Sequence, residues 1–275
     1  MRDIITYSSA ASFAQLQAKI HNIVGQCRDE PLRRLCQGAV ERIFSVKAML
    51  CMPFDMVYSS QAARLDAEMG PAAFAEFARS EDGLSHMEYE LHRVFDFIER
   101  QHGHVVFERL NGLAAALAWD IIEALMRDFI EQSCNRYPLY LLDALDKLKP
   151  IHRNKLFRSE VMQRHQFSVH EKLGTILLEE NNIRGIDRLR LWSKLLFPEE
   201  ALLLAFLEDP VLDTLQRRRD ALIHTRQQQE GALAVGRDEV NLAVIRAVKL
   251  CVMLSMDVSV GKAPTLTEDS AELLL

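Results

Sequence analysis

Ten residues near the C-terminal end, RRRDALIHTR at 217–226, combine residue types that phosphate chemistry uses. A guanidinium binds phosphate oxygens, and a histidine of near-neutral pKa accepts or donates a proton. A carboxylate beside either group can hold it in place. Three interpretations follow: a solvated charged helix surface, a phosphate-binding patch, or the catalytic centre of an enzyme.

A helical wheel separates Arg219 from its charged neighbours. Successive helix residues turn by about 100°, which places Arg219 in the middle of an apolar face. A guanidinium directed toward a core or an interface must find acceptors. The sequence therefore predicts a partner for Arg219, whereas Arg217 and Arg218 are compatible with ordinary surface positions. The apolar face consists of Leu212, Leu215, Leu222 and Ile223.

Asp220 and His224 lie on a different stripe of the same helix. They are four residues apart, so the carboxylate can reach the imidazole and fix its tautomer. Arg219 and His224 diverge by about 140° on an ideal helix. A shared site therefore requires the helix to end or bend near His224, or a second subunit to complete it. A purely structural role also remains open, because arginines bridge helices in many bundles and a histidine near a helix end can bind carbonyls.

The elements that must position these residues are all helices. Apolar residues make up 49% of the 275, with only 11 Gly and 8 Pro, and alternating strand-like runs are nearly absent. We predict an all-α protein in which the long apolar helix 104–135 is the centre of a bundle. Further helices are expected at 9–25, 31–50, after Pro53, after Pro71, 84–101, 138–149, 159–180, from Pro198, from Pro210 to the motif, and at 238–258.

The predicted organisation has three parts. A helical N-terminal segment of unknown role covers 1–101, a helical bundle covers 103–260, and a flexible tail covers 261–275. The linker QHGH between the first two is too short to be free, so the two are able to pack as one body. A turn is expected at 180–185 and a loop at 227–236.

Charge is unevenly distributed along the chain. The formal charge is −6, yet residues 136–226 hold 16 Lys and Arg against 13 Asp and Glu, a balance of +3. A basic stretch at 147–165 would extend a phosphate-binding surface, or it is a solvated helix and turn.

Other chemistry finds little support in the sequence. The five cysteines form no C-x-x-C pair and lie in apolar helical context, which favours reduced, buried thiols in a cytoplasmic protein. No apolar run is long enough to cross a bilayer, and the N-terminus lacks the apolar core of a signal peptide. The histidines lack a ligand set at metal-binding spacing, so we expect no metal and no cofactor.

The motif resembles that of the HEPN superfamily. Its hallmark is an Arg and a His separated by four to six residues, usually with Asn, Asp or His directly after the Arg; here these are Arg219, Asp220 and His224. The family is a helical bundle that opens with a long apolar helix and carries the motif before its last core helix. In this chain, residues 104–135 would be the opening helix and residues 238–258 the last core helix. The resemblance covers about the C-terminal 60% of the chain.

The resemblance implies a metal-independent endoribonuclease that acts as a dimer with a composite site. His224 would transfer protons, Arg219 would clamp the phosphate and Asp220 would orient them, with Arg217, Arg218 and Arg226 as candidate RNA backbone contacts. Such a protein would be a toxin or an antiviral-defence effector, a homodimer through the motif helix, with an antitoxin or defence protein as a further partner.

The chain departs from one HEPN subgroup. Toxins paired with minimal nucleotidyltransferase antitoxins often carry Tyr two residues after the His, where this chain has Arg226. Two alternatives stay open: a non-catalytic HEPN module that binds nucleotide or RNA, and a helical interaction protein in which Arg219 makes a structural ion pair.

Overall fold

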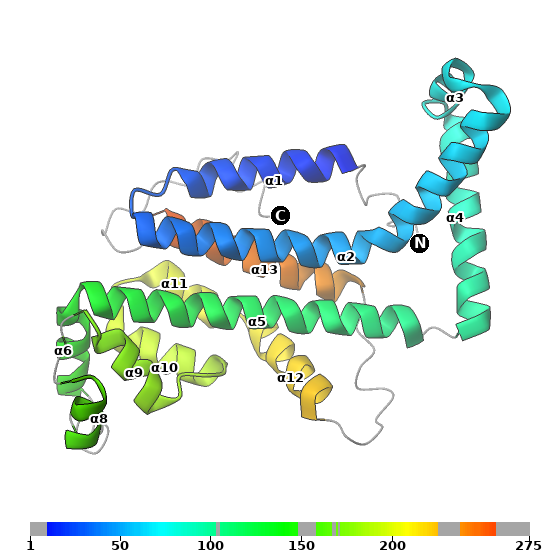
Figure 1. Cartoon of the computed structure of the whole chain (residues 1–275). Helices are drawn as coiled ribbons and strands as arrows, with labels where there is room; N and C mark the ends of the chain where they lie inside the picture. The colour runs from blue at the N-terminus through cyan, green and yellow to red at the C-terminus, as the bar shows by residue number, and fades with distance from the viewer. Residues whose placement is uncertain are drawn as a thin grey trace.

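The computed structural model describes residues 10–102, 105–147, 158–166, 169, 171–224 and 237–256, and the elements formed by these residues are all helices (Figure 1). The prediction of an all-α protein is confirmed. The predicted tail at 261–275 lies outside the described residues. The helices are α1 (Ala10–Gly25), α2 (Glu30–Met69), α3 (Pro71–Phe77), α4 (Glu81–His102), α5 (Val105–Arg136), α6 (Pro138–Lys147), α8 (Ser159–Arg164), α9 (Leu173–Asn181), α10 (Ile186–Leu196), α11 (Ala201–Leu207), α12 (Pro210–His224) and α13 (Arg237–Ser255).

Helix α2 is longer than the sequence predicted. Asp29 caps its start by accepting a hydrogen bond from the Leu32 backbone N–H at 3.2 Å, and Pro31 occupies its first turn. The helix then continues past Pro53, where we expected a separate piece. A proline removes one backbone hydrogen bond and bends a helix without always ending it. Figure 1 shows the second half of α2 turning away from the rest of the molecule.

The single helix predicted at 159–180 is instead two helices, α8 and α9. Between them Gln166 and Glu171 have positive φ angles of 54° and 57°, which a right-handed helix cannot contain. The turn predicted at 180–185 is present, with Asn182 in the left-handed conformation at φ 45° and Gly185 at φ 78°.

One hydrophobic core includes residues of both predicted segments, from Ile20 in α1 to Leu254 in α13. Helix α5 lies at its centre, where Trp119, Ile122 and Leu125 are fully buried. It packs against α2 and α13 on one side and against α9 and α12 on another (Figure 1).

Four thiols are part of this core. Burial raises the pKa of Cys134 to about 12, and burial together with the neighbouring Cys27 raises the pKa of Cys36 to about 12. Thiols with such a pKa stay protonated and unreactive at neutral pH. The prediction of buried, reduced cysteines is confirmed for Cys27, Cys36, Cys134 and Cys251.

Polar side chains on one stripe of α5 hold the neighbouring helices in register. Asn135 Oδ1 accepts hydrogen bonds from the backbone N–H groups of Gly174 at 2.6 Å and Thr175 at 3.3 Å, at the start of α9. Glu131 Oε1 accepts from the Thr175 hydroxyl at 2.6 Å. The first N–H groups of a helix have no partner within the helix, so α5 supplies the cap that α9 lacks.

Helix α5 also fixes the start of α10. Glu123 Oε1 accepts a hydrogen bond from the Gly185 N–H at 2.5 Å. From α12, Gln216 Oε1 accepts from the Ile186 N–H at 2.6 Å. A Cβ at Gly185 would lie 3.0 Å from Gln216 Nε2, and the positive φ there further favours glycine. Helices α5 and α12 therefore together hold the start of α10 in place.

A search of the described helices for a membrane-spanning segment finds none that is both long and apolar enough.

Candidate functional site

The candidate site lies on α12, which buries one face in the core. Leu212 and Leu215 are fully buried, as the helical wheel predicted, and Leu222 is half-buried. The side chain of Ile223 lies outside the described part of the structure. Burial of two leucines fixes the rotation of α12 about its axis, because turning the helix would expose them.

Arg219 meets two carboxylates. Its Nε donates a hydrogen bond to Asp120 Oδ1 at 3.1 Å, across from α12 to α5, and its Nη1 donates to Asp220 Oδ1 at 3.0 Å. The Arg219 side chain is 27% exposed, against 44% for Asp120 and 41% for Asp220. The acceptors that the wheel required are therefore present, and Asp120 is a residue of the site that the sequence did not indicate.

The arrangement leaves part of the guanidinium open. Nη2 of Arg219 makes no hydrogen bond with any residue in the part of the chain that is described. Burial alone lowers the pKa of Arg219, but the hydrogen bonds to Asp220 and Asp120 and the charge of Glu123 outweigh it, so the pKa is raised. Arg219 is a permanent cation, oriented on two sides and able to bind an anion on a third.

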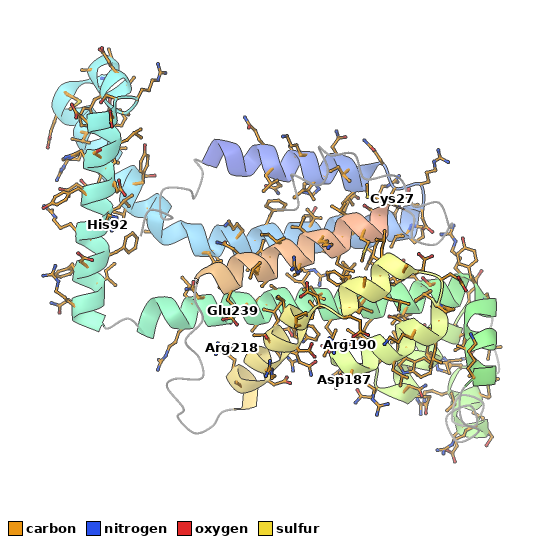
Figure 2. All side chains as sticks on the ribbon, turned by 180° about the vertical axis from the view of Figure 1, so that it is seen from behind. Cys27, His92, Asp187, Arg190, Arg218 and Glu239 are labelled. Carbon is orange, nitrogen blue, oxygen red and sulfur yellow. The ribbon has the colours of Figure 1, made fainter. Side chains whose placement is uncertain are left out.

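Arg217 and Arg218 differ from each other. Arg217 is exposed and donates to groups of its own helix, from Nε to the Asp213 carbonyl at 3.3 Å. Arg218 is half-buried, and its Nε donates to Glu239 Oε1 of α13 at 3.2 Å; Figure 2 shows the two side chains on adjacent helices. Arg218 therefore joins α12 to α13, which a plain surface position would not do.

A second arginine contact holds the beginning of α12. Arg190 of α10 donates to both carboxylate oxygens of Asp213, at 2.8 and 2.6 Å, and its Nε donates to the Leu207 carbonyl at 2.7 Å. The hydrogen bond from Arg190 holds the pKa of Asp213 below its ordinary value. This paired contact positions α12 and was missed by the sequence analysis, because nothing in the spacing of residues 190 and 213 pairs them.

The remaining predicted site residues are only partly placed. His224 is the last residue of α12, and its side chain is outside the described residues, as is Arg226. Of the basic stretch at 147–165, residues 148–157 are outside as well. Arg164 pairs with Glu180 at 3.2 Å, so its charge is partly neutralised, and His165 Nε2 lies 3.1 Å from Glu179 Oε2.

Metal ligands and cavities give no further support to this site. Among the described residues, no group of three or more His, Cys, Asp or Glu side chains is placed to hold a metal ion. A cavity of about 250 Å³ lies away from Arg219, between the start of α2 and the end of α5. Its lining includes Leu32, Phe129, Gln132 and Arg136.

Comparison of the chain with protein-family models, with curated proteins and with solved structures found no match.

Proposed function

We propose that the chain is a metal-independent endoribonuclease of the HEPN type. The observation that carries the proposal is the geometry of Arg219, which two carboxylates orient while its Nη2 makes no hydrogen bond with any of the described residues. His224 follows at the end of the same helix. The proposed substrate is RNA, and the proposed biological role is that of a toxin or a defence effector.

The proposed reaction is an internal transfer of the phosphate. The 2′-oxygen of RNA forms a bond to the adjacent phosphorus while the bond from phosphorus to the 5′-oxygen breaks, leaving a 2′,3′-cyclic phosphate and a 5′-hydroxyl. His224 moves the proton, and the cationic Arg219 stabilises the added negative charge. Asp220, bonded to Arg219, acts as the orienting residue. Pairing of two copies through α12 would place two such sets at one interface.

The ion pair between Arg219 and Asp120 also favours a second candidate, a helical interaction protein. In that case Arg219 serves to join α12 to α5, and the chain has no activity on RNA. Partly exposed pairs of this kind contribute at most about 1 kcal/mol each, so they are compatible with either function.

Three variants separate the two candidates: His224→Ala, Arg219→Ala and Asp120→Asn. The measurement is cleavage of single-stranded RNA in the presence of EDTA, together with the melting temperature of each variant. If the proposal is right, the wild-type chain cleaves RNA, and His224→Ala abolishes cleavage at an unchanged melting temperature. Arg219→Ala loses cleavage as well.

Asp120→Asn is the variant that tests the positioning role of Asp120. Asparagine keeps an oxygen that can accept from Arg219 Nε but removes the negative charge. We expect partial activity, with an effect on the rate larger than on RNA binding. An interaction protein predicts no cleavage by any form, whereas a slightly lower melting temperature of the Arg219 and Asp120 variants is expected for both candidates, because both lose the same ion pair.

A further inference from the structure

A hairpin of helices projects from the core and exposes an unusual amount of apolar surface. We call it the arm: residues 51–102, comprising the second half of α2, α3 and α4 (Figure 1). Six of the twelve large hydrophobic side chains that are exposed among the described residues lie in it. Tyr89 and Phe97 of α4 are 63% and 61% exposed, and Met56 of α2 is 64% exposed. Large apolar groups gathered on one projecting element mark an interaction surface.

The arm has little interior of its own. Among its described side chains, the buried hydrophobic ones are Leu65, Met87 and Phe95, and none of these three belongs to the main core. Polar atoms of Gln61 and His86 are also buried there without a hydrogen bond in the described structure, and the buried carboxylate of Glu90 pairs with Arg93 at 3.3 Å.

The charge of the arm restricts its partner. Residues 51–102 contain four Arg and no Lys against ten Asp and Glu, a formal charge of −6. Such a surface repels a nucleic acid backbone, and it equally repels a second arm in a symmetric contact. It fits a cationic segment that also carries apolar side chains.

The chain itself contains such a segment. Residues 147–158, KLKPIHRNKLFR, hold five Lys and Arg and no Asp or Glu, a formal charge of +5, with Leu, Ile and Phe among them. Helices α6 and α8, which precede and follow residues 148–157, lie at the C-terminal end of α5, whereas the arm joins α5 at its N-terminal end (Figure 1). A helix of 32 residues separates the two attachment points by about 48 Å.

This separation rules out docking within one molecule. Lys147 and Ser159 fix both ends of the chain between them, and the 11 intervening residues can reach outward and return over only about 20 Å. We propose that the arm of one copy binds the cationic segment at 147–158 of a second copy, so that the protein associates head to tail. This contact is separate from pairing through α12 and does not depend on RNA cleavage.

Two variants and their mixture test the proposal. The arm variant is Tyr89→Ser with Phe97→Ser, and because both side chains are exposed the fold loses little. The segment variant is Lys149→Glu with Lys155→Glu. Sedimentation velocity over a concentration series at low and high salt measures self-association. The wild-type chain should form larger assemblies than either variant does. The association should be about tenfold weaker in each variant, and also about tenfold weaker for the wild type at high salt.

The mixture distinguishes head-to-tail binding from every symmetric contact. Each variant keeps one intact half, so the arm of the segment variant should bind the segment of the arm variant in a 1:1 complex. Matched controls lie on exposed positions of the main body: Leu202→Ser with Leu242→Ser, and Arg184→Glu with Arg188→Glu. These controls should associate as the wild type does. Wild-type chains that do not associate in this way, or variants that fail to complement in the mixture, would overturn the proposal.

Discussion

The close approach of α9 to α5 can be tested at Gly174, where two physical effects act in opposite directions. Alanine has a higher helix propensity than glycine, and this alone would stabilise α9 by up to about 1 kcal/mol. The structure predicts the reverse, because a Cβ at Gly174 would lie 2.1 Å from the Glu131 carbonyl oxygen and 2.8 Å from its carbonyl carbon. These atoms belong to the α5 backbone and cannot rotate away.

The size of the effect follows from these distances. A methyl group needs a separation of about 3.5 Å, so α9 must move away from α5 by roughly 1 Å or more. Overpacking of this kind costs about 1–3 kcal/mol. The movement also weakens the hydrogen bonds of Asn135 with Gly174 and of Glu131 with Thr175, at about 1 kcal/mol each. We expect Gly174→Ala to lower the free energy of unfolding by about 3 kcal/mol in total.

Urea denaturation followed by circular dichroism measures this difference. The matched control is Gly38→Ala in α2, where an added Cβ would meet nothing within 4 Å. Only helix propensity acts there, so the control should gain about 0.5–1 kcal/mol. A Gly174→Ala variant as stable as the wild type, or more stable, would show that α5 and α9 do not approach each other as described.

Three further predictions concern ion pairs and thiols. Asp213→Asn should lower the free energy of unfolding at pH 7 by about 1 kcal/mol, as measured by urea denaturation. Because folding lowers the pKa of Asp213, this stabilisation is present above the unfolded-state pKa of about 3.9 and disappears as the pH falls through the folded-state pKa. Equal losses at pH 7 and pH 2 would contradict this reasoning. A double-mutant cycle on Arg218 and Glu239 should give a coupling free energy of about 0.5–1 kcal/mol that falls at high salt, and a value of zero would refute the contact between α12 and α13. The four buried thiols should resist iodoacetamide at pH 8 and become alkylated in denaturant, as mass spectrometry would show; rapid labelling of Cys36 or Cys134 in the native protein would contradict their burial.

Local patterns were enough to predict most helices and the central position of α5. The run LAAALAWDIIEALM is apolar around most of its circumference, and only a helix surrounded by others can bury it. The demand of Arg219 for an acceptor was also predictable, because its neighbours on the wheel are leucine and isoleucine. Breaks caused by positive φ angles at Gln166 and Glu171 were not predictable, since neither residue type signals a left-handed conformation.

The residues that pair with Arg219 and Arg218 could not be identified from the sequence. Asp120 and Arg219 are 99 residues apart, and only the packing of α12 against α5 brings them together. The one available signal was an acid within an apolar helical run, which requires a reason to be there. Arg218 illustrates the same difficulty, because its neighbour Arg217 has the same side chain and points to solvent.

The contacts of α12 explain why an arginine can be both structural and available for binding. Paired arginines hold α12 at two points, Asp213 with Arg190 of α10 and Arg218 with Glu239 of α13. The buried leucines and these pairs fix the helix at several points, and Asp120 sets the direction of the Arg219 guanidinium. Nη2 makes no hydrogen bond within the described part of the chain, and because the side chain is 27% exposed, water can bind it there. A structural ion pair and a phosphate-binding group therefore share this geometry, and cleavage of RNA by the wild-type chain but not by Arg219→Ala is the result that assigns the second role.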